Sequence, residues 1–165
     1  MPSQYFRNRI GGWPPPGHRS ARFTQQLART TEVRPDAAID GVLVAEQIQG
    51  GVEMAVGMTR DAVFGPAVMA GLGGTLVEVL GDVSVRVPPF PDAEARAMVD
   101  ELRARPLLDG VRRHPAADVD ALVAVIMAVQ RMVLDHGEVL AELDINPLVV
   151  GPNAAVAVDA FLRTR

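Results

Sequence analysis

Oxygen-bearing side chains occupy every second position at the start of the segment ELDINPL, residues 142–148. Glu142, Asp144 and Asn146 alternate there with two aliphatic residues. In an extended strand alternate side chains point to one face, so two carboxylates and an amide would line one side of this strand. Oxygen ligands of this kind suit Mg²⁺ or Mn²⁺ rather than a soft metal.

A second short strand follows the turn signal GPNA, residues 151–154, and ends on another carboxylate, Asp159. If those four residues form the loop of a hairpin, Val150 faces Ala155, and counting back pairs Asn146 with Asp159. Directly opposite residues have Cβ atoms about 4.5–5.5 Å apart, so the amide oxygen and the carboxylate can share one small cation. Because Mg²⁺ uses few protein groups and takes its other ligands from water and phosphate, the pair favours a nucleotide-bound metal.

Alternatives stay open at this point. A polar sheet face open to water explains the same residues, and a register slip of one would separate the pair. The glycine-rich segment GLGG, residues 71–74, can approach a phosphate closely or form an ordinary turn. It lacks the spacing and the lysine of a P-loop. The three histidines include no pair at helical spacing, so they add no metal site.

The composition limits the classes of function. The chain has 165 residues, 48% of them hydrophobic, which is enough for one domain with a real core. The net charge of −4 gives no case for nucleic-acid binding, and no apolar run reaches the length of a membrane span. There are no cysteines and no apolar secretory segment at the N-terminus, so we expect a cytoplasmic protein. All 16 basic residues are arginine, so this chain by itself supports no chemistry that needs a lysine.

Hydrophobic periodicity predicts the elements that must position these groups. The predicted strands are residues 41–48, 52–59, a segment from residue 65 that runs into a glycine-rich turn at 71–74, and residues 82–88, 139–145, 147–150 and 154–160. The predicted helices are residues 92–105, with Asp92 near the N-cap, and 118–136, beginning at Asp118. In residues 82–88 three valines alternate with Ser84 and Arg86. Met127 and Met132, in the second helix, are interpreted as core residues rather than as part of a cofactor site.

Strands, then two helices, then further strands predict an α+β domain with the helices packed on a mostly antiparallel sheet. Residues 1–33 contain the breaks GG and PPP and several arginines, and they are predicted to be a flexible tail and linker. The folded domain is expected over residues 34–165.

Several segments in the same order resemble the ATP-grasp domain of ADP-forming acyl-CoA synthetases, the acetyl-CoA synthetases related to succinyl-CoA synthetase. The longest is DGVLVAEQIQGGVEMAVGMTRDAVFGPAVMAGLGGTLVEVLGDVSVRVPPF, residues 40–90; RPLLDGVR and LAELDINPLVV…VAVDA continue the match. The resemblance implies that residues 34–165 are a partial ATP-grasp domain, equivalent to its C-terminal subdomain. ATP-grasp proteins fused to an acetyltransferase carry a similar segment, so this chain can equally be a fragment of one of them.

The resemblance also implies cofactors and roles. It implies ATP and Mg²⁺, with Asn146 and Asp159 as the two metal ligands, in agreement with the hairpin count. It places Glu46 near the adenine and Glu53 at an acidic nucleotide-binding position at the ribose.

The glycine pair Gly73 and Gly74 matches a loop on the phosphoryl-transfer side. Arg86 and Arg112 occupy basic positions of the family pattern, where phosphate contact and a surface ion pair are both open. Arg113 stands where the family usually has glycine.

The implied reaction converts an acid, CoA and ATP into acyl-CoA, ADP and phosphate. The first ATP-grasp subdomain, whose lysines hold the phosphates, has no recognisable counterpart in the sequence. We therefore expect the chain to be inactive alone and to need a partner chain that supplies the rest of the synthetase. A non-catalytic remnant, or a protein-interaction module that uses the same sheet, are the alternatives.

Overall fold

The computed structural model describes residues 48, 50–74, 81–110 and 115–165. Its strands are β1 (Val52–Asp61), β2 (Gly65–Leu72), β3 (Val83–Arg86), β4 (Leu140–Val150), β5 (Ala155–Ala157) and β6 (Ala160–Thr164). Its helices are α3 (Asp92–Asp100), the short 3-10 helix η2 (Arg105–Leu107) and α4 (Val119–His136). The predicted tail, Glu46, Arg112 and all but the last residue of the predicted strand 41–48 lie outside the described residues.

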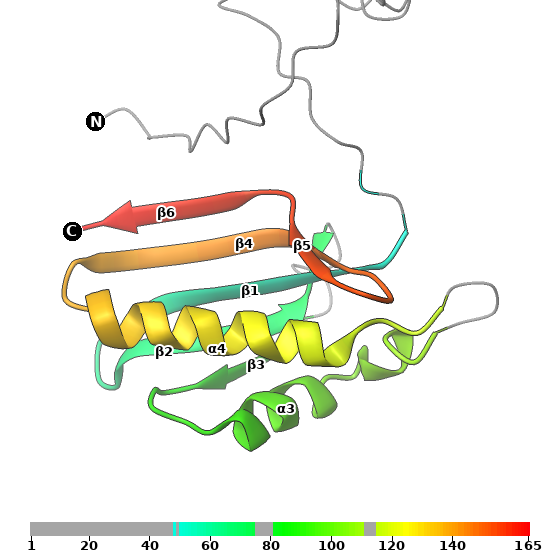
Figure 1. Ribbon diagram of the computed structural model, residues 1–165. Helices are drawn as coiled ribbons and strands as arrows, with labels where there is room; N and C mark the ends of the chain where they lie inside the picture. The colour runs from blue at the N-terminus through cyan, green and yellow to red at the C-terminus, as the bar shows by residue number, and fades with distance from the viewer. Residues whose placement is uncertain (1–47, 49, 75–80, 111–114) are drawn as a thin grey trace, which may run out of the picture. The chain divides into compact units, whose positions relative to one another are not determined.

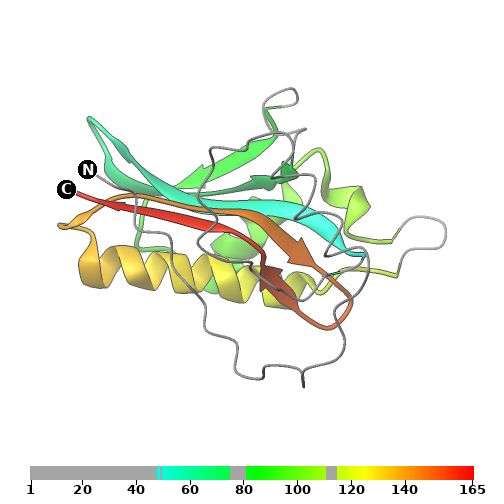
Figure 2. The same cartoon turned by 90° about the horizontal axis from the view of Figure 1, so that it is seen from above.

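The strands form one antiparallel six-stranded sheet in the order β3-β2-β1-β4-β5, with β6 also paired to β4. Strands β5 and β6 follow each other along the same edge of β4, so together they act as one broken edge strand. Helices α3 and α4 both pack on one side of this sheet (Figures 1 and 2). The predicted α+β architecture is confirmed.

The core lies between the sheet and the two helices. On β1 the alternate residues Met54, Val56 and Met58 are at most 1% exposed and belong to this core. The other core residues include Val68, Ala70 and Leu72 of β2, Met98 and Val99 of α3, and Leu122, Ile126, Val129 and Val133 of α4. Because strand side chains alternate, the intervening residues point to the other side of the sheet, which we call the open face.

Helix α4 begins where the sequence predicts. The Asp118 carboxylate caps it by accepting a hydrogen bond from the Ala121 N–H at 2.9 Å, and His136 ends it. Helix α3 ends earlier than predicted, at Asp100. The buried Asp82 carboxylate accepts the N–H groups of Arg103 and Ala104 at 2.9 and 2.8 Å, which diverts the backbone from the helical pattern.

Strand β3 alternates as predicted, but its valines face outward. Ser84 is 3% exposed and donates to Glu101 of the segment after α3, whereas Val85 is 49% exposed on the open face. Met127 packs against the core as predicted. The prediction that Met132 belongs to the core is wrong, because this side chain is 37% exposed.

Candidate functional site

The hairpin register of β4 and β5 agrees with the sequence count. The pairs are Leu148 with Ala157, Val149 with Val156, and Val150 with Ala155. Beyond β5 the register continues, because the Asn146 N–H donates to the Asp159 carbonyl with 3.2 Å between N and O. Asn146 therefore lies opposite Asp159, a residue between the end of β5 and the start of β6. Figure 1 shows β5 and β6 beside β4.

A β-bulge lies next to this pair, where β4 also pairs with β1. The register between β1 and β4 shifts around Ala55, so that Asn146 and Pro147 together face this single residue. A bulge adds an unpaired residue, bends the strand and re-aims a side chain. Asp144 and Asn146 both lie on the open face. Strict alternation would put Leu148 there too, but the extra residue of the bulge turns Leu148 into the core.

The glycine turn after β2 contacts both neighbouring strands. The Gly73 N–H donates to the Glu53 carbonyl at 2.7 Å, and the Gly74 N–H donates to Asn146 Oδ1 at 3.2 Å. Gly74 has φ +71°, and a Cβ built there would overlap Glu53 Oε2. The turn thus brings four predicted site residues together: Glu53, Gly73, Gly74 and Asn146.

Carboxylates gather on the open face around Asn146. The carboxylate of Asp159 accepts a hydrogen bond from the Ala160 N–H at 2.9 Å. Burial raises the pKa of Asp144, and the negative charges of Glu142 and Asp159 raise it further. Glu142 is paired with Arg163, with 3.1 Å between Oε2 and Nη2. We call Glu53, Glu142, Asp144 and Asp159 the acidic cluster.

The donor chemistry of this site fits a hard cation. Asn146 Oδ1 has a second lone pair beyond the one that accepts from Gly74, and the Asp159 carboxylate keeps free acceptor capacity. No group of three or more His, Cys, Asp or Glu side chains in the described part of the chain is arranged to hold a metal alone. An amide and a carboxylate oxygen, completed by water and phosphate, match what Mg²⁺ uses.

Arg86 points away from this site. Its guanidinium pairs with Glu94 at 2.6 Å and with Glu101 at 2.9 Å on the helix-covered side. The hydrogen bonds that Glu101 accepts from Arg86 and from Ser84 lower the pKa of Glu101. Of the two alternatives for Arg86, the ion pair is the one observed.

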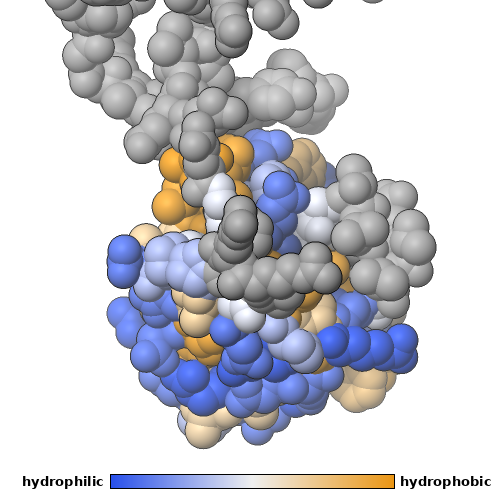
Figure 3. Space-filling model, turned by 90° about the vertical axis from the view of Figure 1, so that its right-hand side faces the viewer, coloured by the Kyte–Doolittle hydropathy of each residue, from blue (hydrophilic) through white to orange (hydrophobic). Residues whose placement is uncertain are grey.

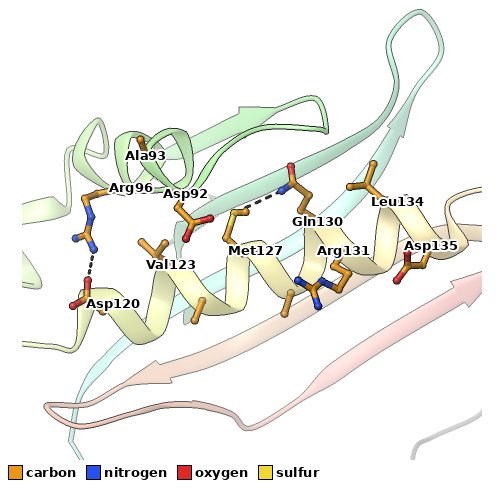
Figure 4. A pocket seen from close by; sticks show the side chains of 12 residues that line it. Asp92, Ala93, Arg96, Asp120, Val123, Met127, Gln130, Arg131, Leu134 and Asp135 are labelled. Atoms are coloured by element: carbon orange, nitrogen blue, oxygen red, sulfur yellow. Dashed lines mark hydrogen bonds and ion pairs between the residues drawn. The ribbon is translucent and has the colours of Figure 1, made fainter.

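A groove of about 1210 Å³ lies elsewhere, between α3 and α4 (Figure 4). The ion pair of Arg96 with Asp120 joins the two helices at one end of it. None of the predicted site residues that the structure describes lines this groove, which is on the helix side of the sheet.

Sequence reasoning missed three parts of the site. It did not identify the bulge at Ala55, the continuation of the chain into β6, or the hydrogen bond from Gly74 to Asn146. Residues 160–164 read AFLRT, without alternation of apolar and polar residues, so no periodic signal in the sequence marks β6.

Residues 19–163 match the family model described as ATP-grasp domain. The chain is 44% identical over 137 residues to the ADP-forming acetate–CoA ligase I of Archaeoglobus fulgidus, covering 83% of this chain and 20% of that protein. It is 43% identical over 129 residues to the beta subunit of the ADP-forming acetate–CoA ligase II of Pyrococcus furiosus, covering 77% of this chain and 55% of the subunit. It therefore spans from a fifth to about half of these relatives.

Solved structures similar to this chain belong to the same kind of enzyme as the sequence relatives. The dinucleotide-forming acetyl-coenzyme A synthetase 1 of Ca. Korarchaeum cryptofilum, in complex with coenzyme A and Mg-AMPPCP, superposes with a TM-score of 0.75 at 35% identity. The superposition covers 89% of this chain and 65% of that one. Within the part of the chain that the structure describes, no helix is long and apolar enough to cross a membrane.

Proposed function

The chain belongs to the ATP-grasp family, and from this premise we propose that its open face binds an adenine nucleotide with Mg²⁺, as part of an ADP-forming acid–CoA ligase. The observation that carries the proposal is the position of Asn146 opposite Asp159 at the break between β5 and β6. An amide oxygen and a carboxylate, carried by residues that lie opposite each other on β4 and after β5, suit a cation that also binds phosphate.

Each residue of the site has a separate task in this proposal. Asn146 and Asp159 hold the cation, and the carboxylate of Glu53 accepts hydrogen bonds from the ribose hydroxyls. Gly73 and Gly74 form the turn that joins these two parts of the site. Glu46, outside the described residues, is assigned to the adenine. When bound, Mg²⁺ neutralises the charge that spreads over the phosphates during transfer.

The reaction we propose joins an acid to CoA while ATP becomes ADP and phosphate. The relatives are named for different acids, among them acetate and 4-hydroxybutyrate, and for this chain we assign no acid. Because the chain has no lysine, we propose that cationic groups for the phosphates come from another domain or chain. A cytoplasmic location, and the division into a tail over residues 1–33 and a domain over residues 34–165, belong to the same proposal.

Apolar side chains on the open face support the need for a partner. Val85 and Phe161 are 49% and 46% exposed, and the strand register places them in one row with Asp144. Exposed apolar groups that flank a polar site are typical of a surface covered by another domain or subunit. Two relatives from Pyrococcus furiosus are themselves named as beta subunits.

Calorimetric titration of the chain with MgADP tests the proposed site. We expect Asn146→Ala and Asp159→Ala each to weaken binding by about ten-fold or more, because each removes one of two protein ligands. Asn153→Ala is the matched control, since Asn153 is an exposed amide in the β4–β5 turn. Equal affinity in the wild type and in both ligand variants would rule out this metal site.

A further inference from the structure

The side chain of Asn146 is held by a residue that lies two strands away. Gly74 follows β2, Asn146 lies in β4, and β1 runs between them in the sheet. The glycine turn packs against the β1 backbone, where a Cβ on Gly73 would meet the Met54 carbonyl, and the Gly74 N–H donates to Asn146 Oδ1 at 3.2 Å. The bulge opposite Ala55 is the local feature that lets β4 present Asn146 in this direction.

This hydrogen bond selects one orientation of the amide. The Gly74 N–H can donate only to the oxygen of the amide, because the flipped amide would place its NH₂ group, also a donor, against the glycine N–H. Oδ1 is therefore turned toward Gly74, and one of its two lone pairs remains for another group. The end of the side chain that can bind a cation is fixed before any cation arrives.

The backbone N–H groups of the glycine turn both donate hydrogen bonds within the protein. The N–H of Gly73 is used by the Glu53 carbonyl and the N–H of Gly74 by Asn146. A Cβ on Gly73 would lie 2.5 Å from the Met54 carbonyl oxygen, and one on Gly74 would overlap Glu53 Oε2. Glycine is therefore needed at both positions because the turn is closely packed. The two N–H groups already have acceptors in the protein, so they are not free to bind a phosphate.

We propose that Gly74 is a positioning residue of the metal site: its N–H locks the Asn146 amide so that Oδ1 is presented to the cation. The inference rests on the proposed function, because it assigns Asn146 as a ligand. Groups that orient a metal ligand typically contribute about ten- to a hundred-fold to metal affinity. Gly74 acts through Asn146 and has no contact of its own with the cation.

The test measures Mg²⁺ affinity rather than turnover. The full 165-residue chain is titrated with Mg²⁺ at a fixed, saturating concentration of ADP, and Mn²⁺ binding is followed in parallel by electron paramagnetic resonance. We expect Gly74→Ala to raise the apparent Mg²⁺ dissociation constant about ten-fold. Gly65→Ala is the matched control, because Gly65 also has a positive φ, of +78°, but a Cβ there would meet nothing within 4 Å.

A double-mutant cycle separates positioning from general disruption. If Gly74 acts through Asn146, adding Gly74→Ala to Asn146→Ala causes no further loss of Mg²⁺ affinity. An equal loss in both backgrounds would overturn the inference, since the substitution would then act through Glu53 or the turn itself. If Gly74→Ala binds Mg²⁺ as well as Gly65→Ala does, the inference also fails. If Asn146→Ala alone leaves Mg²⁺ affinity unchanged, it is the proposed function that fails.

Hydrogen exchange gives a test that needs no change at Gly74. The Gly74 amide should be protected from exchange in the wild type and in Asn146→Asp, which keeps an acceptor oxygen. Its protection should fall by about ten-fold in Asn146→Ala, where the acceptor is gone. Unchanged protection of Gly74 in Asn146→Ala would show that the amide oxygen is not its partner and would overturn the inference.

Discussion

Asn146 illustrates why this position suits an amide rather than a third acid. Its backbone N–H pairs with the Asp159 carbonyl, and its Oδ1 accepts from Gly74. Burial and then the acidic charges nearby already raise the pKa of Asp144. A carboxylate at residue 146 would add one more negative charge to this cluster, whereas the neutral amide supplies a ligand oxygen without adding charge.

Arg86 provides a residue-level prediction that separates stability from binding. Arg86→Ala should lower the free energy of unfolding by about 1 kcal/mol or less, because the ion pairs with Glu94 and Glu101 are partly exposed. The affinity for MgADP should stay unchanged, since Arg86 lies on the helix-covered side. Urea denaturation and calorimetry measure the two quantities.

The control for this change is Arg131→Ala, because Arg131 makes no ion pair with any described residue. It should alter neither stability nor binding. A drop of about ten-fold in MgADP affinity for Arg86→Ala alone would restore the phosphate-contact alternative.

At the scale of elements, local patterns predicted more than long-range pairings. The register of the β4–β5 hairpin followed from four turn residues, because loop length fixes the pairing of adjacent strands. The alternation of β3 predicted a strand but could not tell which side is covered, so the inward position of Ser84 was not foreseen. The bulge at Ala55 depends on pairing with a strand about ninety residues later, and no local signal encodes it.

The same limit applies to the candidate site. The sequence placed Asn146 opposite Asp159 because both lie in one hairpin. It could not place Gly74 beside Asn146, since that contact requires the order of three strands in the sheet. The resemblance to a family supplied the glycine pair as part of the site, but not the hydrogen bond that it makes.

Helix α4 gives a prediction at this scale. Ile126 is fully buried against the sheet and Met132 is 37% exposed, although both belong to the predicted apolar stripe. Ile126→Ala should lower the free energy of unfolding by about 2–4 kcal/mol, because it leaves a cavity in the core. Met132→Ala, on the same helix, should change it by about 0.5 kcal/mol or less. Equal losses in thermal or urea unfolding would contradict the observed orientation of the helix.

Over the whole molecule the two sides of the sheet differ in kind. One side is closed by α3 and α4, and the other presents the acidic cluster together with exposed apolar residues. A single row across the open face runs Val85, Met69, Gly57, Asp144 and Phe161. Figure 3, which views the end of the domain near the β4–β5 turn, shows hydrophobic side chains between hydrophilic ones at the surface.

This charge distribution predicts that ADP binds more tightly with a divalent cation than without one. In the acidic cluster Glu142 is paired with Arg163, while Glu53, Asp144 and Asp159 form no ion pair with the residues that the structure describes. A polyphosphate approaching these carboxylates is repelled. A repulsion of about 1.4 kcal/mol, roughly that of one weak charge pair, already means a ten-fold loss of affinity.

Removing Mg²⁺ with EDTA should therefore weaken ADP binding by about ten-fold or more, and excess Mg²⁺ should restore it. Adenosine is the control ligand, because it carries no phosphate and its affinity should not depend on the cation. Isothermal titration of both ligands, with and without EDTA, measures the difference. If ADP binds equally well in EDTA, the open face does not use a metal to offset its negative charge, and the carboxylates near Asn146 belong to a solvated surface instead.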